Sequence, residues 1–170
     1  MPDGVRWVGL GVHARASTVA VFDRATGEVV IRRVAGRPHG LLPVLREIPR
    51  PARVVCEAGP TGYGLARRAR AEGIEMAVCA PGKTERPPSD RVKTDKRDAI
   101  RLARLSAAGE LTLVTVPSVE REQLRDLVRC REDIRADLTR ARHRIGNFLL
   151  RREVYWEGPV RRGRASTARG

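Results

Sequence analysis

The stretch RWVGLGVHARASTVAVFDRATGEVVIRRV, residues 6–34, decides the fold class of this 170-residue chain. It contains three short apolar and β-branched runs, at residues 6–12, 18–23 and 29–34. The last two runs are separated by turn residues, among which Gly27 can adopt a positive φ. Three strands joined by such short links predict an antiparallel meander.

The pattern changes after the meander. Residues 39–48 carry leucine and isoleucine at helical spacing, and two prolines then close the segment. Residues 53–57 and 75–79 are short apolar runs, and a helical pattern at residues 63–72 lies between them. This order predicts a meander followed by β-α-β crossovers, which is an α/β fold with a mixed sheet and flanking helices.

The second half of the chain begins with a basic, proline-rich loop at residues 80–92 and a helix at about 94–108. Residues 118–150 then form the longest pattern, in which seam positions alternate steps of three and four. The seam consists of Leu124, Leu127, Arg131, Ile134, Leu138, Ala141, Ile145 and Phe148. Such a heptad seam predicts a coiled-coil helix that pairs with another helix, and the alternative is a long helix packed on its own domain.

The charge of the chain indicates a polyanionic partner. Lysine and arginine number 34 against 20 acidic residues, so the net charge is +14. A GC-rich genome explains the preference for arginine over lysine but not the excess of base over acid, so we expect nucleic-acid binding.

The three cysteines form neither a disulfide framework nor a CxxC motif, and no apolar run spans a membrane, so a soluble cytosolic protein is expected.

Three acidic residues are the candidate site. Glu57 ends an apolar strand, at the sheet edge where α/β proteins build their sites, although a strand end facing water is equally compatible with the pattern. Asp95 and Asp98 fall on one face in the first turn of a helix, where acids also complement the helix dipole. Carboxylates clustered among cations suit Mg²⁺.

The motif Gly-x-Gly-x-x-Ala at residues 9–14 is rejected as a dinucleotide fingerprint, because a strand follows it. The three histidines show no ligand spacing.

Four motifs together resemble one family closely. They are VGLGVH at 8–13, EAGPTGYG at 57–64, RVKTDKRDA at 91–99 with LARL at 102–105, and LRDLVR at 124–129. This combination is similar to the insertion-sequence transposases that have a DEDD-type, RuvC-like N-terminal domain and a C-terminal serine-bearing domain. Members of that family act with a structured bridge RNA.

The resemblance implies a ribonuclease-H-like fold with a RuvC-like DEDD domain at residues 1–112. The residue patterns add a coiled-coil helix at 118–150 and a basic, disordered tail at 151–170, where the resemblance ends. The resemblance further implies Mg²⁺ bound by catalytic carboxylates at Glu57, Asp95 and Asp98. It also implies DNA and guide RNA as partners, and a homodimer or higher oligomer formed through the long helix. The expected location is the bacterial cytoplasm, at the nucleoid. Expected nucleic-acid contacts are Lys83, Arg86, Arg91, Lys93, Lys96 and Arg97.

Two departures from the family pattern predict impaired catalysis. The first acid of the family corresponds to Gly11, so one metal ligand is vacated. The serine domain is also missing, which suggests a truncated chain. The expected function is therefore the N-terminal part of a transposase in DNA transposition and recombination, with weak or absent activity. The alternative is a non-enzymatic nucleic-acid-binding protein that interferes with the full-length enzyme. An actin-like nucleotide-binding protein is a weaker alternative.

Overall fold

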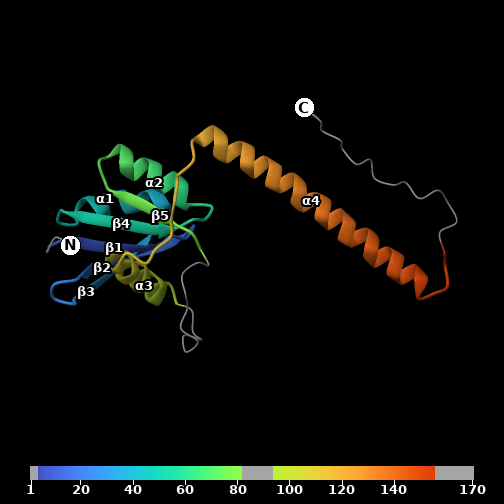
Figure 1. The fold of residues 1–170 in the computed structure, drawn as a ribbon, viewed down its shortest axis with the longest axis horizontal. Helices are drawn as coiled ribbons and strands as arrows, with labels where there is room; N and C mark the ends of the chain where they lie inside the picture. Colours follow the sequence, from blue (N-terminus) through green and yellow to red (C-terminus); the bar gives the residue numbers. More distant parts are fainter. Residues whose placement is uncertain (1–3, 82–93, 156–170) are drawn as a thin grey trace. The chain divides into compact units, whose positions relative to one another are not determined.

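The computed structural model describes residues 4–81 and 94–155, in two compact units that divide between Pro117 and Ser118. The first unit holds every strand and all but the last helix (Figure 1). In chain order its elements are β1 (Arg6–Gly11), β2 (Ala16–Asp23), β3 (Val29–Ala35), the 3-10 helix η1 (Pro38–Gly40), α1 (Leu41–Arg46), β4 (Ala52–Glu57), α2 (Gly62–Ala71), β5 (Met76–Cys79), α3 (Asp95–Ala108) and β6 (Leu113–Val114). The second unit contains α4 (Val119–Leu150).

The strands form one mixed sheet in the order β3-β2-β1-β4-β5-β6. β1, β2 and β3 are antiparallel neighbours, which confirms the predicted meander. β4 and β5 then extend the sheet in parallel with β1, as the predicted crossovers require, and β6 closes it antiparallel to β5. The six-stranded mixed sheet with flanking helices is the predicted ribonuclease-H-like α/β arrangement.

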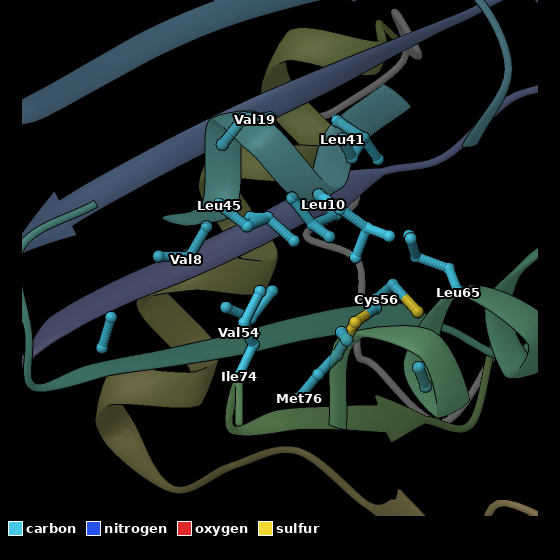
Figure 2. Packing of buried hydrophobic residues seen from close by; sticks show 14 of the residues in the cluster. Val8, Leu10, Val19, Leu41, Leu45, Val54, Cys56, Leu65, Ile74 and Met76 are labelled. Carbon is cyan, nitrogen blue, oxygen red and sulfur yellow. The ribbon is translucent and has the colours of Figure 1, made fainter. Parts of the chain in front are cut away.

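Helices cover both faces of the sheet in the first unit (Figure 1). On one face, α1 and α2 bury apolar side chains against β1, β4 and β5. Figure 2 shows Leu41 and Leu45 of α1 over Val8 and Leu10 of β1. On the other face, Leu102 of α3 packs in a smaller cluster. β1 is therefore buried on both sides, which is typical of the central strand of a two-sided α/β sheet.

Gly9 determines how closely α3 approaches β1. A Cβ atom added to Gly9 would lie 2.0 Å from the Ala99 carbonyl oxygen and 2.6 Å from the Ala103 amide nitrogen. Only glycine allows a strand and a helix backbone to come this near to each other. Because Asp95 precedes Ala99 by one helical turn, the close contact brings the N-terminus of α3 toward the end of β1.

The second unit is described by itself. α4 begins at Ser118, whose hydroxyl accepts a hydrogen bond of 3.3 Å from the Arg121 amide, and Glu120 and Glu122 lie in the first turn. These are the capping and charge preferences of a helix start. No residue of α4 is buried. The predicted long helix is confirmed in extent, and its pairing with a second helix stays a prediction.

Some details differ from the sequence prediction. The helix expected at 39–48 is divided into η1 and the shorter α1. The two-residue strand β6 was not predicted, because it has too few residues to show an alternating pattern. Most of the expected basic loop, at 82–93, and the tail from 156 onward lie outside the described residues. Among the described helices, none is both long and apolar enough to cross a membrane.

Candidate acidic site at the carboxyl edge of the sheet

Glu57 and Gly11 lie at the carboxyl ends of two adjacent parallel strands. The register pairs Leu10 with Cys56, so the residue that follows each of them reaches the same edge of the sheet. Alternation along β4 puts Glu57 on the face of Val55, which packs with Leu102 of α3. Gly11 likewise shares the face of Gly9, beneath α3. The two positions are therefore neighbours on the face that α3 covers.

The first turn of α3 completes this edge. Thr94 caps the helix, and its hydroxyl accepts a hydrogen bond of 3.3 Å from the Arg97 amide. Asp95 and Asp98 follow in the first turn, as predicted. A Cβ atom on Gly11 would lie 3.4 Å from the Asp95 carbonyl oxygen, an ordinary contact distance. The backbone therefore brings Gly11 beside Asp95, and position 11 has room for a side chain.

His13 contacts one of the candidate acids. Its Nε2 lies 3.2 Å from Oδ1 of Asp95, and both side chains are more than half exposed. Its backbone amide donates a hydrogen bond of 3.4 Å to the Ser17 hydroxyl. A Cβ atom on Gly11 would lie 4.0 Å from the same Nε2. The spacing of the histidines predicts no ligand role for His13, and the available signal was its place two residues after Gly11, just beyond the end of β1.

The carboxylates share an edge of the sheet without forming a complete ligand cluster. Asp and Glu oxygens are the hard ligands that Mg²⁺ prefers. Within residues 4–81 and 94–155, however, no three His, Cys, Asp or Glu side chains are grouped closely enough to hold a metal ion. The carboxylate oxygens are therefore suitable ligands for a divalent metal, but in the described residues the side chains are not close enough together to bind one. The catalytic and metal-binding roles of Glu57, Asp95 and Asp98 stay predictions.

Two buried thiols adjoin the site. Burial is the main cause that raises the pKa of Cys56 to about 12 and the pKa of Cys79 to about 11, from an ordinary value of 9.0. The nearby Glu57 carboxylate raises both pKa values further. Cys79 is the register partner of Glu57 on β5. Both thiols are therefore protonated at neutral pH, so neither offers a thiolate as a nucleophile or a soft metal ligand.

The predicted nucleic-acid contacts are only partly described. Lys96 and Arg97 are exposed in the first turn of α3, beside the two aspartates. Lys83, Arg86, Arg91 and Lys93 lie outside the described residues. The described geometry therefore combines acidic and basic side chains at one helix start. A metal ion bound by the aspartates would lie close to a nucleic-acid phosphate that the neighbouring Lys96 and Arg97 side chains contact.

Comparison with known proteins gives a consistent result. A transposase family model, that of the IS110-type DEDD transposases, matches residues 8–152. A protein of Sinorhizobium fredii named as the transposase y4qE is 50% identical over 102 residues, covering 60% of this chain and 26% of the relative. The transposase for insertion sequence element IS1533 of Leptospira borgpetersenii is 44% identical over 99 residues, covering 58% of this chain and 29% of the relative. No solved structure matches with significance.

A further Sinorhizobium fredii protein named as the transposase y4rJ is 35% identical over 143 residues, which cover 74% of this chain and 36% of that relative. The chain therefore spans between 26% and 36% of the length of these three relatives. The matched residues 8–152 include β1 with Gly11, the strand that ends at Glu57, the first turn of α3, and α4. The chain therefore belongs to the IS110-type DEDD transposase family.

Proposed function

We propose that this chain acts in DNA transposition as the nucleic-acid-binding, RuvC-like part of a DEDD transposase. The observation that supports the proposal is that β1 and β4 end side by side at Gly11 and Glu57, with the Asp95 backbone at the start of α3 close to Gly11, within the segment that the family model matches. The net charge of +14 supports a polyanionic partner. The proposed partners are the element's DNA and a structured guide RNA, which would place the protein at the bacterial nucleoid.

The proposed cofactor is Mg²⁺, bound weakly because position 11 carries no carboxylate. Glu57, Asp95 and Asp98 would hold it, and the ion would supply charge neutralisation at a phosphate. Without a ligand from β1, two-metal chemistry loses both a charge and a bridging oxygen. We therefore propose that catalysis is impaired in this chain and that nucleic-acid binding is retained.

Isothermal titration of the Gly11→Asp variant with MgCl₂ tests the metal proposal. We expect affinity to rise at least ~10-fold over the parent chain, because a carboxylate is added where the contact distance of 3.4 Å leaves room for it. Gly11→Asn is the matched control, with nearly the same size and no charge. Equal affinity in the parent, Asp and Asn chains would show that position 11 is not the vacated ligand position.

Fluorescence anisotropy with labelled duplex DNA tests the binding proposal. Affinity should fall steeply between 50 and 200 mM salt, since phosphate contacts release counterions. Lys96→Ala should weaken binding more than Arg46→Ala, which removes the same charge on α1 at the opposite face and leaves Glu72 without its partner. A flat salt response would contradict phosphate contact. Equal effects of the two variants would contradict a contact at the start of α3.

The vacated acid also favours a second candidate function, a non-enzymatic binder that competes with an intact transposase for nucleic acid. A strand-cleavage assay with Mg²⁺ separates the two functions. Cleavage that is lost in Glu57→Ala would support an active enzyme. Binding without cleavage, in both the parent and Glu57→Ala chains, would support the binder. In both cases we propose that α4 joins copies of the chain into a dimer or a higher oligomer.

A further inference from the structure

The seam of α4 is an apolar surface that the protein's own fold leaves exposed. It consists of the eight seam residues Leu124, Leu127, Arg131, Ile134, Leu138, Ala141, Ile145 and Phe148. Its large apolar members are about half exposed or more, from 48% for Leu138 to 69% for Leu127. Because no residue of α4 is buried, packing within the chain contributes little to the stability of this helix. A contiguous exposed apolar surface of this kind is typical of an interaction site.

The order of side chains along the seam indicates which way a second copy lies. In heptad terms, Leu124, Arg131, Leu138 and Ile145 occupy a positions, and Leu127, Ile134, Ala141 and Phe148 occupy d positions. Two seam positions are exceptional: Arg131 is the only charged residue and Ala141 is the only small one. A partner must accommodate both of them in the core of the pair.

A parallel pair in register accommodates them badly. Each a residue then faces its own copy, and so does each d residue. Arg131 would face the partner's Arg131, and Ala141 would face the partner's Ala141. The first contact brings like charges together in a desolvated seam, and the second leaves a void. Like charges in an interface cost several kcal/mol.

An antiparallel pair resolves both problems in one register. In the register whose two-fold axis is level with residue 136, each a residue faces a d residue of the partner. Arg131 then lies opposite the partner's Ala141, so the largest polar side chain meets the smallest one and its guanidinium has space to reach water. The same register puts Leu124 opposite the partner's Phe148, Leu127 opposite the partner's Ile145, and Ile134 opposite the partner's Leu138. No seam residue is left over.

The charges beside the seam do not reverse this preference. A parallel pair would gain one exposed contact between Asp137 and the partner's Arg142, worth less than about 1 kcal/mol. An antiparallel pair would bring Asp137 and Arg135 near their own copies at the crossing point. Each of these is already paired within its own helix, Asp137 with Arg140, and Arg135 with Glu132 at 3.4 Å.

We infer that α4 pairs with α4 of a second copy in antiparallel orientation, with the axis of symmetry at Ala136. The inference rests on the proposed oligomerisation through α4 and adds its direction and register. Its consequence is that the two N-terminal units attach at opposite ends of the paired helices. At a rise of 1.5 Å per residue, the two copies of Leu124 would lie about 36 Å apart along the axis.

Cysteine crosslinking of the full chain tests the inference, in a Cys130→Ser background that removes the exposed thiol of α4. A disulfide requires Cα atoms within about 7 Å. Under mild oxidation, an equimolar mixture of Leu124→Cys and Phe148→Cys chains should form covalent dimers of one chain of each kind. Either chain alone should not form covalent dimers.

The outcomes separate direction from association. Self-crosslinking of Leu124→Cys alone would indicate a parallel pair, which overturns the inference and leaves the proposed oligomer intact. A monomer by sedimentation equilibrium would overturn both, because the seam would then be covered by something other than a second copy. Position 141 gives a non-covalent check. Ala141→Glu should dimerise at least ~10-fold more tightly than Ala141→Arg, since position 141 then faces the partner's Arg131.

Discussion

Gly9 and Gly11 lie on the same strand and the same face, but only Gly9 faces backbone atoms of α3 at close range. We expect Gly9→Ala to destabilise the first unit by about 1–3 kcal/mol or more, because its Cβ would lie 2.0 Å from the Ala99 carbonyl oxygen. Urea unfolding followed by the fluorescence of Trp7, which is buried in this unit, measures the change. Trp156→Phe in the background removes the other tryptophan.

Gly11→Ala is the matched control for that prediction. The nearest atom to its Cβ would be 3.4 Å away, so we expect a change of less than about 1 kcal/mol. Equal losses in the two variants would contradict the close approach of α3 to Gly9. The same comparison bears on function, because a tolerated side chain at position 11 is required if a carboxylate there is to restore a ligand.

The buried thiols predict a loss of stability at alkaline pH. Their folded-state pKa values, about 12 for Cys56 and about 11 for Cys79, lie above the ordinary value of 9.0 that holds in the unfolded chain. The stabilising effect is therefore complete below about pH 9 and is lost as the pH rises toward the folded-state values. The free energy of unfolding should fall less between pH 8 and pH 10.5 in Cys79→Ala than in the parent chain.

Thiol labelling provides a control on the same residues. At pH 8, DTNB should react quickly with the exposed Cys130 and slowly with Cys56 and Cys79. In urea, all three cysteines should react. Rapid native-state labelling of three thiols would mean that the cysteines of the sheet are accessible, and the alkaline loss of stability would then need another cause.

At the scale of the element, the N-terminus of α3 determines where two of the three acids lie. Thr94→Ala should cost about 1 kcal/mol and increase amide hydrogen exchange at Arg97, because the capping hydroxyl that accepts its hydrogen bond is lost. Thr94→Ser keeps the hydroxyl and should behave like the parent chain. Exchange that is unchanged in Thr94→Ala would show that the cap does not hold the first turn.

The elements of the fold were largely predictable from local patterns. β1, β2 and β3 are apolar or β-branched runs, with turn residues between β2 and β3, and α3 and α4 carry helical periodicity with Thr94 and Ser118 as caps. The place of Glu57 at the carboxyl edge of the sheet followed from the rule that parallel strands end together, whereas a site shared with the start of α3 was implied only by the family resemblance. A two-residue strand such as β6 has no period to detect.

Contacts that depend on the path of a short loop were not predictable in this way. The pair between His13 and Asp95 requires the chain to turn between β1 and β2 while α3 lies above it. α3 is distant in sequence from β1 and β2, and no spacing rule links the two residues. The approach of α3 to Gly9 is a similar case, since a glycine in a strand indicates close packing without naming the neighbour.

At the scale of the whole molecule, the two units should differ in how their stability depends on concentration. The first unit has its own buried clusters, whereas α4 buries none of its residues. A long helix without a packed face is marginal in water, so the helicity of α4 should depend on association with a partner. Mass action then makes its melting temperature rise with protein concentration.

Thermal melts of the Trp156→Phe chain at 5 and 200 μM test this difference, because fluorescence then reports on Trp7 in the first unit alone, whereas the signal at 222 nm includes α4. The fluorescence transition of Trp7 should stay at the same temperature, since its surroundings belong to the first unit alone. The circular dichroism loss at 222 nm should include a part that shifts upward at the higher concentration, and Leu138→Asp should abolish that shift because it places a charge in the seam. If Trp7 and the 222 nm signal shift together, folding of the N-terminal unit is itself coupled to assembly, and the two units do not unfold independently.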